Sequence, residues 1–415
     1  MNAPSELRDG TLTPSAMLAL LAAAPHRLLF FAGASGVLLS LAWWAAWLVG
    51  VRWSALALPP PPVPAGWAHA IGMQYQVLGL FIFGFLLTVF PRWMDQPAFG
   101  RRHYVPVAGA IFAGYLLTLA SLAGFPLLLH AGVVLTLLGW TVGCLLLLRV
   151  LWRDGGTQYH ALSIWAALAL GGVGLAMFAR YLHSGDARLA FGAIKIGTFG
   201  FLLPVYATVA HRMVPFFAQA AIPGRAMYRP GWILASFWVL VLAHLMGELA
   251  HAYAWLWPVD LALAVLTGYW WWRWQPLRTR GIRLLWVLHL AFAWLPVAFG
   301  LYALQGAIYA ATGAFELGRA PVHALTVGFF GSMLVAMVTR VTQGHSGRPL
   351  EMGAVAWACF LGVQAVSVLR IAAELLPDSP AWMAVAAVGW LLAFLPWVLR
   401  SLGIYLSPRA DGKPG

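Results

Sequence analysis

Residues 67–90 read WAHAIGMQYQVLGLFIFGFLLTVF, a run that contains no Asp, Glu, Lys or Arg and decides the fold class. A helix needs roughly 20 apolar residues to cross the hydrocarbon core of a bilayer. Runs of this kind recur between Leu28 and Leu406 with only short polar breaks. The pattern predicts an all-α polytopic membrane protein embedded in the lipid bilayer, with no water-soluble domain.

The composition of the 415-residue chain leads to the same prediction. It is 62% hydrophobic and 9% charged, whereas soluble domains carry about 25% charged residues. The formal net charge is +13, but the basic residues lie singly in short loops and form no patch. We therefore expect no nucleic-acid partner. The two cysteines, Cys144 and Cys359, lie inside apolar runs, so we expect no disulfide.

The apolar runs divide the chain into a segment 1–27, a single twelve-helix membrane domain 28–406 and a tail 407–415. Ten or eleven helices are the alternative, because the breaks near Gly124 and Ala254 are short. The predicted spans are 28–49, 67–90, 104–124, 126–148, 160–182, 189–211, 231–253, 255–273, 284–312, 320–341, 353–376 and 381–406.

Lys and Arg are distributed unevenly between the loops on the two sides of these spans. With twelve spans, 19 of the 25 fall on the side that holds both termini, which the positive-inside rule assigns to the cytoplasm of an inner-membrane protein. These 19 are Arg8, Arg27, Arg92, Arg101, Arg102, Arg149, Arg153, Arg212, Arg225, Arg229, Arg273, Arg278, Arg280, Arg283, Arg340, Arg348, Arg400, Arg409 and Lys413.

A short motif recurs in every fourth span. Residues 83–87 read FGFLL, residues 199–203 read FGFLL, and residues 327–331 read the looser VGFFG. All three run from the outer to the cytoplasmic side. The repeat predicts three four-helix units.

Two histidines lie at the same depth on separate spans. His69 and His323 each lie about one turn inside the outer end of their helix. Inward-facing imidazoles on two helices of a bundle are a typical way to hold haem iron from both faces. The alternative is a pair of hydrogen-bonded core histidines.

A second set of histidines belongs to the cytoplasmic half. His211, His289 and His345, with His26 as a fourth member, would converge if their helices are neighbours. Imidazoles suit haem iron and copper alike, so the set predicts a second haem or a copper centre. The alternative is that His345 caps its loop and His289 hydrogen-bonds a backbone group.

Span 231–253 carries His244, Glu248 and His251 at positions i, i+4 and i+7, which would share one helix face. One Glu-x-x-His copy is too few ligands for a carboxylate metal site, so we do not assign one. We expect Lys195 to extend to the outer surface.

Arg370 and Glu374 are separated by four residues in span 353–376. On a helix this spacing places the two side chains together, so we expect them to neutralise each other.

Residues 323–328 read HALTVG and residues 337–350 read MVTRVTQGHSGRPL. These two stretches resemble the NnrS family, and the resemblance extends over the whole chain. It includes residues 286–296, WVLHLAFAWLP, and residues 84–93, GFLLTVFPRW. The resemblance implies a haem- and copper-containing protein of the bacterial inner membrane, linked to nitric oxide metabolism and denitrification. One departure is that Ile71 and Gly72 stand where the family usually has His and Glu. His69 therefore inherits a ligand role, whereas chemistry that needs the missing pair is in doubt.

The chain also resembles subunit I of the haem-copper oxidases, which has twelve helices in three four-helix units and a low-spin haem between histidines of its second and tenth helices. His69 and His323 occupy matching places. This analogy of fold supports His69 and His323 as ligands of a haem b.

Three functions remain open from the sequence. The first is a haem protein that binds, detoxifies or reduces nitric oxide, including a reductase-like oxidoreductase whose electron donor is unidentified. The second is a transporter of a metal, haem or nitrogen-oxide-related solute, since interrupted helices are typical of transporters. The third is an assembly or protective factor for other metalloproteins.

Overall fold

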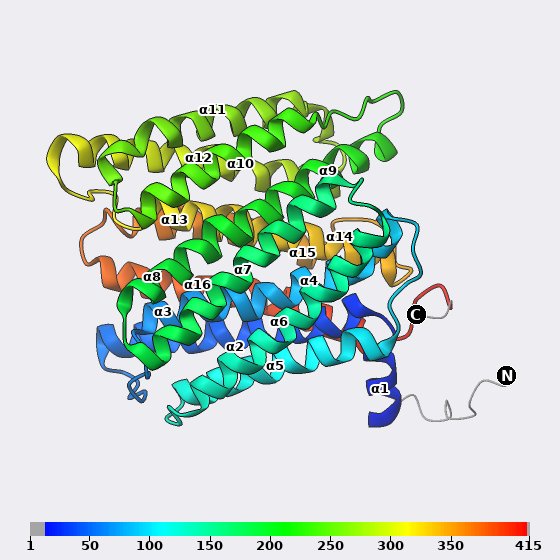
Figure 1. The fold of residues 1–415 in the computed structure, drawn as a ribbon, viewed down its shortest axis with the longest axis horizontal. Helices are drawn as coiled ribbons and strands as arrows, with labels where there is room; N and C mark the ends of the chain where they lie inside the picture. The colour runs from blue at the N-terminus through cyan, green and yellow to red at the C-terminus, as the bar shows by residue number, and fades with distance from the viewer. Residues whose placement is uncertain (1–12, 413–415) are drawn as a thin grey trace.

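The computed structural model describes residues 13–412; residues 1–12 and 413–415, which include Arg8 and Lys413 of the charge count, lie outside the described part. All regular structure within 13–412 is helical. Eleven of the described helices are long and apolar enough to cross a membrane, which confirms an all-α polytopic membrane protein (Figure 1).

The spans follow the predicted ones closely. They are α2 (Pro25–Trp53), α3 to α4 (Ala65–Trp93), α5 (Arg101–Leu122), α6 (Leu128–Arg153), α7 (Tyr159–Ser184), α8 to α9 (Ala187–Ala221), α10 (Gly231–Leu249), α12 (Arg283–Thr312), α13 to α14 (Ala320–His345), α15 (Ala354–Ala372) and α16 (Ser379–Tyr405).

A shorter helix, which is not among these eleven, covers the expected eighth span. Helix α11 covers Trp257–Arg273, 17 residues, or about 26 Å at the α-helical rise. It lies beside α10 and α12 (Figure 1). Short 3₁₀ turns at Tyr253–Trp255 and Pro276–Thr279 flank it. Outside the spans, residues Pro14–Leu21 form the short helix α1, which the sequence did not suggest.

Three of the spans form the centre of the bundle. In Ala65–Trp93, 94% of the most apolar stretch is buried, and in Ala187–Ala221 and Ala320–His345 the share is 78%, against 33–56% in the other long spans. These central helices are the three that carry the repeated motif, FGFLL in two of them and VGFFG in the third. The high burial of all three helices agrees with the predicted repeat. The resemblance to an oxidase subunit stays a prediction.

Each central helix is interrupted by a π-helical segment. These segments are η1 (Gly72–Val77), η2 (Ile196–Leu202) and η5 (Ala324–Gly331). A π segment re-aims side chains relative to a regular α-helix and is frequent at functional sites. Regular helices were expected at these positions, because hydropathy does not distinguish the two.

The start of α2 and the end of α16 meet at one end of the bundle, which we call the termini face; the other end is the opposite face. Helix α16 packs along α2, and the Arg27 guanidinium donates to the carbonyls of Tyr405 and Ser407 just after α16. Helix α1 lies at the same face (Figure 1). An even number of crossings follows, as twelve spans require.

Candidate functional site

The first candidate site lies at the opposite face and contains the predicted haem ligands. His69 is on α3, three residues before η1, and His323 ends α13 directly before η5. The two half-buried rings are within electrostatic range of each other and of the Arg370 guanidinium. The predicted ion pair of Arg370 with Glu374 is confirmed at 2.7 Å.

Both imidazoles keep a ring nitrogen available. His323 Nδ1 lies 2.9 Å from the Arg319 carbonyl oxygen and donates to it, which leaves Nε2 as the acceptor. Metal-bound histidines are usually oriented by a bond of this kind. His69 stacks on Trp44, with ring centroids 4.4 Å apart, and its Nδ1 is buried without a hydrogen-bond partner. Each imidazole therefore presents a nitrogen without a protein partner.

The four histidines predicted at the termini face do not gather into one centre. The His211 Nδ1 is 2.8 Å from Nε2 of His160, and its Nε2 is 3.2 Å from the Pro230 carbonyl oxygen. Both nitrogens are thus used, because His211, in the middle of α9, faces His160 at the start of α7 and Pro230 just before α10. Within residues 13–412, no group of three or more His, Cys, Asp or Glu is arranged to hold a metal ion.

Two of the four do meet. The rings of His26 and His345 have centroids 4.4 Å apart and line a cavity of about 280 Å³ together with Arg27, Arg92 and Arg409. His26 Nδ1 is buried and has no partner. The remaining member of the set, His289, lies apart from them in the wall of a separate cavity.

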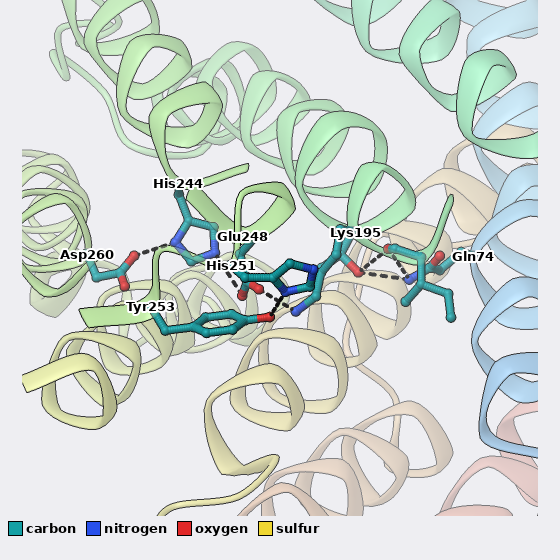
Figure 2. Close-up of polar contacts among 9 residues, drawn as sticks. Gln74, Lys195, His244, Glu248, His251, Tyr253 and Asp260 are labelled. Atoms are coloured by element: carbon teal, nitrogen blue, oxygen red, sulfur yellow. Dashed lines mark hydrogen bonds and ion pairs between the residues drawn. The ribbon is translucent and has the colours of Figure 1, made fainter. Parts of the chain in front are cut away.

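The second candidate site is a row of charged side chains in the membrane interior near the opposite face (Figure 2). Lys195 Nζ is 2.8 Å from Glu248 Oε2, and Glu248 Oε1 is 3.6 Å from His244 Nε2. His244 Nδ1 in turn is 2.6 Å from Asp260 Oδ1. Glu248, His244 and Asp260 are buried. The row connects α8, α10 and α11.

This row corrects two predictions. Lys195 does not extend to the surface but pairs with Glu248. His251 does not continue the helix face of His244, because α10 ends at Leu249 and His251 adopts φ 55°; its Nδ1 lies 2.8 Å from the Tyr253 hydroxyl oxygen. Asp260 was not predicted as a member of the row, since its one signal was an acidic side chain within an apolar span.

Hydrogen bonds between two central helices adjoin the row. Gln74 Nε2 in η1 donates to Thr198 Oγ1 (2.8 Å) and to the Ile194 carbonyl (3.3 Å), beside Lys195 (Figure 2). A Cβ at Gly197 would lie 2.1 Å from Gln74 Oε1. A larger residue there would displace the Gln74 side chain and disturb these hydrogen bonds.

A cavity of about 260 Å³ lies between the charged row and the His323 helix. Lys195, Glu248 and Asp260 line it, and so do Arg319 and Val322, which closely precede His323. At about 30 Å³ per water molecule, this space holds several waters. The row therefore lies next to the start of the helix that carries His323.

The fold and these sites define a polytopic helical membrane protein with histidines and paired charges in its interior. The sequence model of the NnrS family, described as NnrS protein, matches residues 20–409, essentially the whole chain. The chain therefore belongs to the NnrS family, as its motifs indicated. No curated protein matches the sequence.

Proposed function

We propose that this NnrS-family chain is a haem-binding membrane protein of nitric oxide metabolism. Family membership suggests a nitric-oxide-related membrane protein. The observation that supports haem binding is the pair formed by His69 and His323, two imidazoles at one depth with a nitrogen left free on each. A bis-imidazole haem b exchanges electrons but has no free coordination position.

The side chains around the pair have definable roles in holding such a group. The Arg319 carbonyl fixes the His323 tautomer by accepting its Nδ1–H. Trp44 supports the His69 ring from one side, and Arg370 supplies a positive charge near both rings. Copper would fit the His26–His345 pair only with further ligands, since two imidazoles do not complete a copper site.

The absorption spectrum of the purified full-length protein, recorded with and without nitric oxide, tests the proposal. We expect stoichiometric haem b bands and, at a second centre or where one imidazole leaves the iron, a spectral change on nitric oxide addition. A haem whose spectrum does not change when nitric oxide is added would favour an assembly or protective role. A colourless protein would exclude haem binding.

The charged row favours transport as a second candidate function. Charged groups at membrane depth frequently mark ion or proton pathways, and Lys195, Glu248, His244 and Asp260 lie in one connected row. Proteoliposomes containing an interior pH dye would report such a pathway. Proton flux that is present with the wild-type protein and absent with Asp260→Asn supports transport. If the wild-type protein gives no proton flux, proton movement through the row is excluded.

A further inference from the structure

A large cavity opens near the termini face, away from the outer histidines. It holds about 800 Å³ between α9, the segment after it, the turn that follows α11, and α12. Ligand pockets of drug-sized molecules occupy roughly 300–1,000 Å³. Much of its wall is apolar or aromatic, including Val214, Ile222, Trp271 and Trp274. The cavity has the size and walls for a large, flat, mainly apolar molecule.

His289 in this wall has no hydrogen-bond partner on either ring nitrogen, although the residue is fully buried. Buried polar groups are nearly always paired, so an imidazole left unpaired on both sides demands an explanation. The backbone at His289 is held, because its carbonyl accepts from Trp271 Nε1 at 2.8 Å. His211, equally buried at the same face, uses both nitrogens. The available His289 nitrogens point to a metal.

A second unpaired group lines the same cavity. Arg225 donates through Nη2 to the carbonyls of Trp274 and Gln275, while its Nη1 is buried without a partner. Its charge lies within electrostatic range of the His289 ring. Arg278 lines the cavity as well. Guanidinium groups bind carboxylates well, so the ligand carries negative groups.

We propose that this cavity binds an iron tetrapyrrole with carboxylate side chains, with His289 as its one protein ligand and Arg225 on a carboxylate. This deepens the proposed function and rests on it, because a haem held by His69 and His323 has no open position. No other His, Cys or Met among residues 13–412 lines the cavity. An iron with one imidazole keeps a free position, at which a gas such as nitric oxide binds.

Haem content and electron paramagnetic resonance of the purified full-length protein test the site. We expect two haems per chain, one low-spin and one high-spin, with carbon monoxide binding only to the reduced high-spin haem. His289→Ala should lose the high-spin haem and carbon monoxide binding while keeping the low-spin signal. Arg225→Gln should retain less of the high-spin haem. The exposed His183 provides the matched control, His183→Ala.

The outcomes separate this site from the outer one. If haem is lost only in His289→Ala and the spectra of His69→Ala match wild type, haem binds in the cavity at His289. The same result refutes haem binding by His69 and His323. If the protein holds a single haem, and only His69→Ala and His323→Ala lose it, the proposed haem site in the cavity is refuted. Should His289→Ala fold poorly, His289→Gly with added imidazole decides: recovery of the high-spin signal supports ligation, and no recovery in folded protein contradicts it.

Discussion

Lys195 and Glu248 form an ion pair inside the membrane domain, with Nζ and Oε2 2.8 Å apart. The pair joins α8 to α10. Glu248 is buried, and the Lys195 side chain is 24% exposed. Because Glu248 also contacts His244, the pair is the end of a row rather than an isolated contact. Opposite charges in such surroundings stabilise each other.

Breaking this pair from one side should destabilise the protein strongly. Lys195→Met leaves the Glu248 carboxylate without its cation, and removal of one partner of a buried pair costs about 3–5 kcal/mol. The double variant Lys195→Met/Glu248→Met should cost less than the sum of the two single variants. Thermal unfolding in detergent gives the comparison.

The exposed ion pair of Arg52 with Asp378 is the control, because both side chains contact water and the pair joins two helix ends. Arg52→Gln should leave the unfolding temperature unchanged. If Lys195→Met also leaves the unfolding temperature unchanged, the ion pair of Lys195 with Glu248 does not stabilise the protein.

The sequence predicted the depth of these residues but not their partners. Hydropathy locates a residue along its helix, so His69 and His323 were placed near the ends of their spans, and both lie within the first two turns. It does not fix how each helix is rotated about its axis. For that reason His211 was expected beside His289 but contacts His160, and Lys195 was expected at the surface.

Local deviations from regular helices escaped prediction for a related reason. The three π segments occur in stretches without a charged residue or a proline, where no residue type distinguishes them from α-helix. Asp260 escaped because one acidic residue in the first turn of a helix is usually explained by the helix dipole. Its partner His244 is 16 positions away in the sequence.

The contact between α5 and α6 provides a second prediction. A Cβ at Gly114 would lie 2.6 Å from the Gly132 carbonyl oxygen, which is backbone and cannot move aside. Gly114→Ala should therefore destabilise the protein by about 1–3 kcal/mol. Gly109 on the same helix has no neighbouring atom within 4 Å, so Gly109→Ala should be neutral or stabilising by up to about 1 kcal/mol. Equal unfolding temperatures would contradict the close approach of these helices.

Topology can be tested with reporter fusions. Both termini should lie in the cytoplasm, because 19 of the 25 Lys and Arg residues fall on that side of the predicted spans. Fusions after Gly415 and within residues 94–100 should both report the cytoplasm, and a fusion within 54–64 should report the other side. An external signal from either of the first two would refute the assignment.

A cellular prediction follows from the proposed function. A strain without this protein should grow more slowly than its parent when nitric oxide is supplied. The His183→Ala chain should restore growth, whereas His323→Ala should not, since it lacks a ligand of the proposed haem. Equal growth of deletion strain and parent at every nitric oxide dose would rule out this role.

The outer histidines make the last prediction. His69→Ala and His323→Ala should each abolish the low-spin haem signal, because low-spin iron needs an imidazole on both faces. His323 has its tautomer set by the Arg319 carbonyl at 2.9 Å, whereas the His69 Nδ1 has no such partner. His69→Ala should therefore leave a high-spin haem on the better-oriented His323, and His323→Ala should lose the haem altogether. Electron paramagnetic resonance and haem content measure both. Identical low-spin spectra in the two variants and in wild type would show that the iron is held elsewhere.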